Sequence, residues 1–177
     1  MKRLKALIAA AAVAAAAAGP ASAEIVLEGV HWQAGRVEGG RVAAWQDIKV
    51  LVDGPPKLDN RLRARLVLKN RGPKAEEGIL LRYSLTARVG PSDKPGDGAW
   101  AVPFAVEERR VPKVGPNQVV EVPLEAGAQL ELYVRRLARA GWWPDRLKLQ
   151  VMLEPHAGCV ALQTAEDILE LKPELRP

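Results

Sequence analysis

Few residues in this sequence have side chains that could perform nucleophilic or acid–base catalysis. After residue 23, the serine, threonine, histidine and cysteine residues are Ser84, Ser92, Thr86, Thr164, His31, His156 and Cys159. None of the serines stands in a Gly-x-Ser-x-Gly elbow, and no histidine lies near a serine in sequence, although residues far apart in sequence can meet in a fold. We therefore predict no catalytic residues, and an enzyme ranks third among three functional classes.

The pair His156 and Cys159 has a spacing that suggests metal binding. It supplies two ligands, whereas a closed zinc site needs four, and the remaining histidine is His31. We expect a turn here and no metal or cofactor. Asp93 and Asp97 lie in the segment GPSDKPGDG, which lacks the alternating acidic residues and final glutamate of a calcium loop. We expect this segment to connect two strands.

Two groups of side chains are the candidate binding residues. Trp142 and Trp143 are adjacent, and two neighbouring tryptophans do not easily both point inward, so we expect one of them to be exposed for contact with a partner or a sugar, with core packing of both as the alternative. Alternate arginines form a basic strand face that would attract an anionic polymer or a lipid headgroup. These arginines are Arg61, Arg63 and Arg65, together with Arg82 on the next run. The alternative is a solvated face paired with Glu107, Glu108 and Glu121.

The first 23 residues have the order of a secretory signal peptide. Lys2 and Arg3 precede an apolar run over 7–18, and Ala21-Ser22-Ala23 stands before Glu24. A membrane anchor is the alternative, but the run is about a dozen residues long where a spanning helix needs roughly 20. We predict cleavage after Ala23, Sec export to the periplasm or the outside of the cell, and no transmembrane anchor in the mature chain.

Removing this segment also changes the charge and leaves one domain. The formal net charge falls from +5 to +2, and this small charge together with export argues against a nucleic-acid partner. Residues 24–177 are a normal length for a single domain. Cys159 is the only cysteine, so packing alone must hold the core. We expect this cysteine to be buried, the alternative being an intermolecular disulfide or an exposed thiol.

The run from Arg61 to Lys69 alternates with period two. Leu62, Ala64, Leu66 and Leu68 share one face and the arginines share the other, which is typical of a half-buried antiparallel strand. A second run, from 79 to 89, repeats the pattern. The link between them, 70–78, is longer than the loops of tight hairpins. We therefore predict that it carries the chain from one sheet to another.

Similar runs at 25–32, 42–52, 100–108, 118–124, 147–153 and 160–171 bring the total to about eight strands. Pro103 and Pro123 fall inside two of these runs and favour edge strands or bulges. The segment 128–140 has helical spacing, with Gly141 as its C-terminal stop. The sequence predicts an all-β, immunoglobulin-like antiparallel β-sandwich over 24–177, with one short helix inserted between late strands.

Three segments carry a family resemblance: VLKNRGPKAEEGILLRYSL, VPKVGPNQVVEVPL and LKLQVMLEP. Together they resemble the immunoglobulin-like modules of bacterial exported proteins, including the CARDB-like, adhesion-type group. In that group a strand ends in Asn-x-Gly before a crossing loop, and a Gly-Pro turn precedes an edge strand. Asn70-Arg71-Gly72 and Gly115-Pro116-Asn117 occupy these positions, over roughly residues 42–155. The helix at 128–140 replaces the short connection of the family.

The resemblance implies a non-catalytic module that recognises or scaffolds other proteins. We therefore expect protein–protein interaction or envelope assembly, with an envelope or extracellular protein bound at a sheet edge or at Trp142 and Trp143. The alternative is a carbohydrate-binding or anionic-polymer-binding module, in which those tryptophans and the basic strand face hold a polysaccharide.

Overall fold

The computed structural model describes residues 24–39, 41–94, 96–155 and 161–172. The predicted signal peptide, His156 and Cys159 lie outside the described residues. No helix in the described ranges is long and apolar enough to cross a bilayer. The described chain forms ten strands and one helix: β1 (Ile25–Glu38), β2 (Arg41–Asp47), β3 (Val50–Val52), β4 (Asn60–Asn70), β5 (Glu76–Pro91), β6 (Ala99–Trp100), β7 (Ala105–Val114), β8 (Val119–Glu125), α2 (Gly127–Arg139), β9 (Trp142–Leu153) and β10 (Gln163–Lys172).

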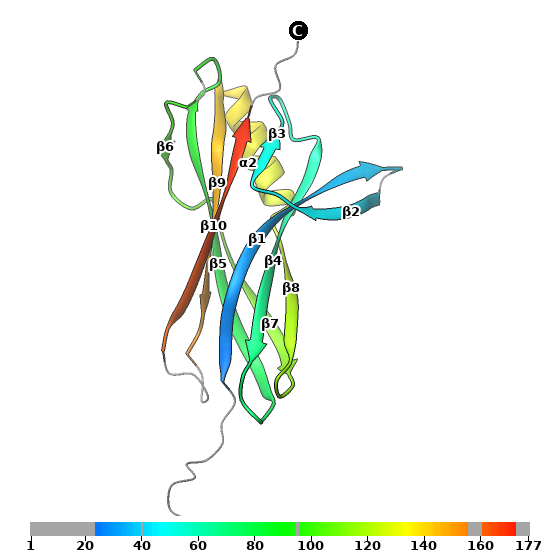
Figure 1. Cartoon of the computed structure of the whole chain (residues 1–177). Helices are drawn as coiled ribbons and strands as arrows, with labels where there is room; N and C mark the ends of the chain where they lie inside the picture. Colours follow the sequence, from blue (N-terminus) through cyan, green and yellow to red (C-terminus); the bar gives the residue numbers. More distant parts are fainter. Residues whose placement is uncertain (1–23, 40, 95, 156–160, 173–177) are drawn as a thin grey trace, which may run out of the picture.

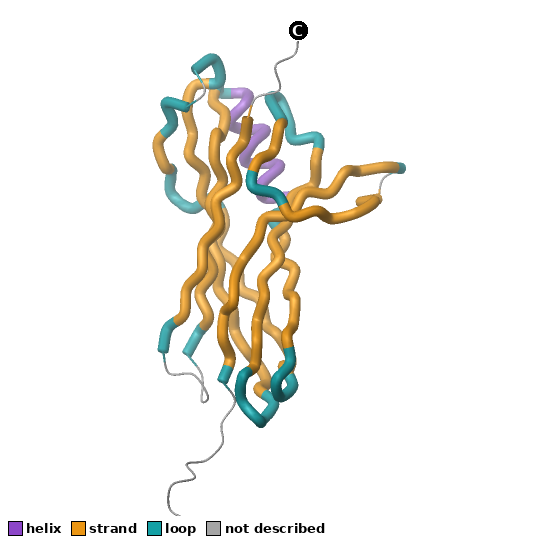
Figure 2. The backbone as a smooth tube through the Cα atoms, viewed as in Figure 1, coloured by secondary structure: helices purple, strands orange, loops and turns teal. Residues whose placement is uncertain are grey.

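These strands form two sheets, which confirms a mostly β fold with a single helix. The four-stranded sheet has the order β2-β1-β4-β8, and the six-stranded sheet has the order β3-β10-β9-β5-β6, with β7 also paired to β5. All pairs are antiparallel except β3 with β10. Figures 1 and 2 show the two curled sheets side by side along the long axis, with α2 near one end. The buried side chains of both sheets belong to one hydrophobic cluster.

The alternation of β4 and β5 is confirmed. Leu66 and Leu68 on β4 and Leu81 on β5 are fully buried, because every second side chain of each strand faces the shared core. The predicted crossing is confirmed as well, since β4 belongs to the four-stranded sheet and β5 to the six-stranded one. The remaining side chains of β4 and β5 therefore lie on the two opposite outer faces of the protein.

Asn70 fixes the point where the chain changes sheets. Its side chain is fully buried at the end of β4. The Oδ1 atom accepts hydrogen bonds from the backbone N–H groups of Glu24 and Gly72, and Nδ2 donates to the carbonyls of Lys74 and Val114. One amide thus satisfies backbone groups from four separate points of the chain, which would otherwise be buried without partners.

Helix α2 closes the core at its end of the molecule. Leu130 and Val134 are buried, and the backbone N–H of Leu130 donates to the carbonyl of Ala126. No side chain caps the N-terminus of α2. The packing of its buried side chains and the contacts at its C-terminus must therefore stabilise the helix. Gly141 has a φ of +79°, the left-handed conformation expected of the residue that ends a helix.

Three predicted strands have different boundaries in the structure. The run 42–52 is two strands in different sheets, because the chain leaves the four-stranded sheet at Ile48, whose N–H donates to the carbonyl of Trp32. The run 100–108 is interrupted, since Pro103 lies between β6 and β7 and belongs to neither. The prediction for Pro123 is confirmed, because β8 is an edge strand. The last main strand begins at Trp142 rather than Leu147.

The edge of β1 that faces away from β4 is covered along its N-terminal half by side chains, not by a neighbouring strand. β2 pairs only with 33–38 of β1. Nearer the N-terminus of β1, Gln163 of β10 accepts a hydrogen bond from the N–H of Leu27 and donates to the carbonyl of Ile25. Asp167 accepts one from the N–H of Trp32. The other half of β1 continues with β2 into a hairpin that projects from the body of the molecule (Figures 1 and 2).

Candidate functional site

The predicted basic strand face exists on β4, but its three arginines already have partners. Arg61 pairs with Glu131 of α2. Arg63 places its guanidinium 4.1 Å from the ring centroid of Trp45, and its Nε donates to Gln33 at 2.8 Å. Arg65 is shared between Asp47 of β2 and Glu121 of β8. These contacts tie β4 to its neighbours, and carboxylates neutralise Arg61 and Arg65, while Arg63 keeps its charge beside the neutral Trp45 and Gln33.

The Arg65 network also changes the acidity of its members. A hydrogen bond from Gln33 is the main cause that lowers the pKa of Asp47, and Arg65 lowers it further. Hydrogen bonds to Asp47 and then Glu121 raise the pKa of Arg65. Both shifts favour the charged forms, so the ion pair of Arg65 and Asp47, which holds β2 to β4, persists at neutral pH.

Arg82 lies on the other sheet, apart from the arginines of β4. It projects from β5 and pairs with Glu108 of β7 and Glu154, at 2.8 Å in each case. Two of the expected arginine–glutamate pairs are therefore present, Arg82 with Glu108 and Arg65 with Glu121. Glu107 instead accepts a hydrogen bond from Gln129. Because the two sheets have opposite outer faces, Arg82 does not join Arg61, Arg63 and Arg65 in one patch.

The two adjacent tryptophans face opposite ways. Trp142 is 45% exposed, while Trp143 is 7% exposed and belongs to the core. The indole Nε1 of Trp143 is buried and has no hydrogen-bond partner in the described part of the chain. Strand geometry explains the difference, since both residues lie on β9, where successive side chains alternate. Trp142 remains a candidate contact residue, and Trp143 is corrected to a core residue.

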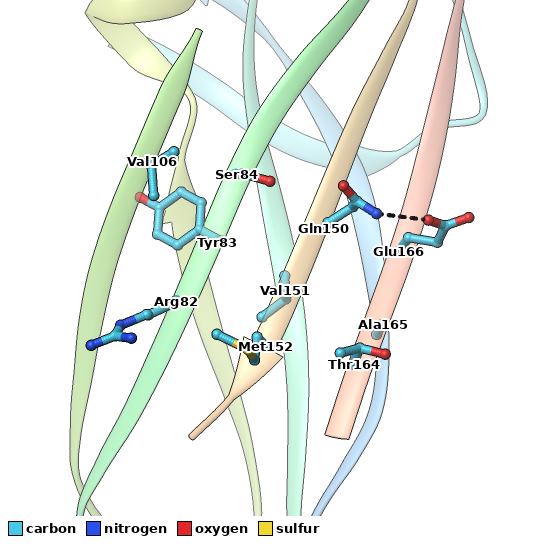
Figure 3. Close-up of a pocket in the computed structure, with 10 residues that line it drawn as sticks. All are labelled: Arg82, Tyr83, Ser84, Val106, Gln150, Val151, Met152, Thr164, Ala165 and Glu166. Atoms are coloured by element: carbon cyan, nitrogen blue, oxygen red, sulfur yellow. Dashed lines mark hydrogen bonds between the residues drawn. The ribbon is translucent and has the colours of Figure 1, made fainter. Parts of the chain in front are cut away.

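A shallow hollow of about 390 Å³ lies on the outer face of the six-stranded sheet (Figure 3). Ser84 stands opposite Gln150 on β9 and opposite Val106 on β7. Gln150 donates to Glu166 at 3.3 Å. The side chains of Ser84 and Thr164 are small and leave room between longer neighbours. The sequence alone does not predict this hollow, because the pairing register of the strands decides which small side chains lie together. The hollow is lined by Arg82, Tyr83, Ser84, Val106, Gln150, Val151, Met152, Thr164, Ala165 and Glu166.

Among the described residues, the side chains that could do acid–base chemistry lie on different parts of the fold. Ser84 and Thr164 lie at the hollow, whose lining includes no histidine. His31 stands opposite Arg65 on the other sheet. Asp93 and Asp97 are exposed between β5 and β6. The hollow therefore offers contact surface for a side chain or a short peptide, and within the described residues no hydrogen bond joins its hydroxyls to the carboxylate of Glu166, which accepts from Gln150.

The free sheet edges differ in how well they are protected. β7 carries Pro112 and the charged run 107–110, β8 carries Pro123, and β3 has only three residues. β2 has seven residues, RVAAWQD, with charges only at its ends and no proline, and β1 is its one paired neighbour in the sheet. Proline and central charges are the usual means of blocking an edge, so β2 is the edge most open to another strand. Sequence analysis missed this because it merged β2 with β3.

No protein-family model and no curated protein sequence matches the chain significantly. Among solved structures, the crystal structure of Spo0M, a sporulation control protein from Bacillus subtilis, is similar over 90% of this chain and 51% of that chain. The sequence identity is 14% and the TM-score is 0.30. The chain thus spans about half the length of that protein.

Proposed function

We propose that this chain is an exported, non-catalytic immunoglobulin-like β-sandwich module, similar to the CARDB-like group, that binds another protein of the cell envelope. The order of residues 1–23 supports export, and the two antiparallel sheets with one shared core support the sandwich. The proposed mode of binding is strand addition, in which an extended segment of the partner pairs with the edge of a sheet.

The free edge of β2 is the observation that carries this proposal. Its centre, around Ala44, is exposed and uncharged, and it lies on the hairpin that projects from the body of the molecule (Figure 1). The contacts of Trp45 with Arg63 and of Asp47 with Arg65 hold β2 in place before binding. A preorganised edge binds more tightly because less ordering entropy is lost.

Polysaccharide binding is the second candidate, and the exposure of Trp142 is the observation that favours it. An exposed indole can stack on a sugar ring. The partnered state of the arginines on β4 weakens the anionic-polymer form of this hypothesis. Loss of retention on a glycan column after Trp142→Ala, with protein capture unchanged, would favour this second function.

The test of strand addition is capture from the native envelope fraction at high salt. The mature protein should retain one envelope protein, and Ala44→Lys should reduce its capture by about tenfold or more, because lysine on an edge strand blocks pairing with another strand. The matched control is Val119→Lys, which places the same charge at an exposed position on the protected edge β8. Equal capture by Ala44→Lys and the wild type would exclude β2 as the binding edge.

A further inference from the structure

Helix α2 presents three arginines that have no acidic partner in the part of the chain that the structure describes. Within the described residues, Arg135, Arg136 and Arg139 form no ion pair, whereas Arg61 and Arg65 of β4 and Arg82 and Arg88 of β5 each pair with a carboxylate. At about 100° per residue these three side chains fall within one arc of the helix, opposite the buried Leu130 and Val134. Together with Lys57 they are called the α2 basic face below.

Lys57 joins this face across a hollow of about 330 Å³. The hollow is lined by Pro56, Lys57, Arg135, Ala138 and Arg139. Its walls are therefore proline, alanine and the aliphatic stems of three cationic side chains. Lys57 has an acidic neighbour in Asp59, at 3.5 Å, and both side chains are exposed, so this pair neutralises little of its charge.

Stabilisation of the helix explains only part of this cluster of arginines. Arg136 and Arg139 lie in the last turn, where cations favour the negative end of the helix dipole. Arg135 lies before that turn and is four residues from Arg139, a spacing at which like charges repel. The face thus keeps a positive field directed into solvent, which complements an anionic surface.

The apolar part of the same face indicates what kind of anionic surface fits. Leu132 lies in the same arc as the three arginines and is 50% exposed. A helix with basic side chains and an exposed leucine on its outward face suits the headgroup region of a bilayer, where the cations meet phosphates and the leucine meets acyl chains. An acidic protein segment would satisfy the arginines and leave Leu132 without a role.

We propose that the α2 basic face docks this protein on anionic phospholipid headgroups at a membrane surface. The contact is peripheral and reversible, since it uses four cations and one leucine rather than a spanning segment. It uses a different surface from β2, so membrane docking and strand addition can succeed or fail independently.

Vesicle co-sedimentation tests this proposal with the mature chain. The protein should sediment with vesicles of phosphatidylcholine mixed with phosphatidylglycerol, should not sediment with phosphatidylcholine alone, and should bind less as salt rises above about 0.15 M. Each neutralised cation near the surface is expected to lower the partition coefficient about fivefold, so Arg135→Gln with Arg139→Gln should lower it about 25-fold. Leu132→Ala should weaken binding further without changing its salt dependence.

The matched control is Arg109→Gln with Arg110→Gln, which removes the same charge from the exposed edge β7 and should leave most of the vesicle binding. Circular dichroism verifies that each variant keeps its fold. Equal loss in the control and the α2 variant would overturn the proposal, because net charge alone would then explain the binding. Absence of sedimentation with the anionic vesicles at low salt would overturn it as well. Binding to polyglutamate without binding to the vesicles would also overturn it.

Discussion

At the scale of single residues, Asn70 links the change of sheet to stability. Its amide makes four hydrogen bonds to backbone groups while fully buried. Asn70→Ala leaves buried donors and acceptors without partners, at about 1–3 kcal/mol each where water cannot reach them. We expect the free energy of unfolding to fall by about 3 kcal/mol, measured by urea denaturation. Asn117→Ala, an exposed turn residue with φ of 55°, serves as the comparison, and equal losses would argue against the role of Asn70.

Single residues also show where sequence reasoning stops. The pattern predicts that one of two adjacent tryptophans is exposed, but only the pairing of β9 shows that it is Trp142. Likewise, alternation correctly places Arg63 and Arg65 on an outer face. It cannot show that Trp45 and Asp47 of β2 and Gln33 of β1 contact these arginines. Contacts between strands depend on register, which no local pattern in this chain specifies.

At the scale of elements, helix α2 was predicted almost to its ends because a 3.6-residue period, Gly141 and the basic last turn all agree. Its stability must come from packing, since it has no side-chain cap and no acidic residue in its first turn. Leu130→Ala should lower the free energy of unfolding by about 2–5 kcal/mol, because Leu130 is almost fully buried. Leu132→Ala makes the same chemical change at an exposed position and should cost less than about 0.5 kcal/mol. Similar thermal midpoints for the two variants would contradict this account of the helix.

The strands were predicted unevenly for a physical reason. β4 and β5 each bury one face, so alternation identifies them and the long link between them indicates the crossing. β2 and β3 follow each other in the sequence without a turn signal, since the break at Ile48 carries neither glycine nor proline. Ile48 still bonds to Trp32 of β1, whereas the next residue, Lys49, turns to β10: its carbonyl accepts from the N–H of Glu170 and its side chain pairs with Asp167. These are contacts of long range that composition does not reveal.

At the scale of the whole molecule, the two sheets are joined where β1 meets β10. Trp32 is fully buried; its backbone N–H donates to Oδ2 of Asp167, and its Nε1 donates to the Asp167 carbonyl, both at 3.1 Å. Oδ1 of Asp167 accepts from the N–H of Ile168 and pairs with Lys49. The carboxylate of Asp167 therefore covers part of the edge of β1 that β2 does not pair with. The outer edge of β2 has no such cover among the described residues.

Removing that carboxylate should loosen the contact between the sheets. Asp167→Ala leaves the N–H of Trp32 without its acceptor in a buried position, so we expect a loss of about 2–4 kcal/mol in the free energy of unfolding. Amide hydrogen exchange should report faster exchange at Trp32, with little change in the middle of β5. Glu166→Ala, one residue earlier on the exposed face of β10, should change neither quantity beyond about 0.5 kcal/mol. Unchanged protection of Trp32 in Asp167→Ala would show that β1 is held to β10 by the apolar core alone, and the carboxylate would then have no part in closing this edge.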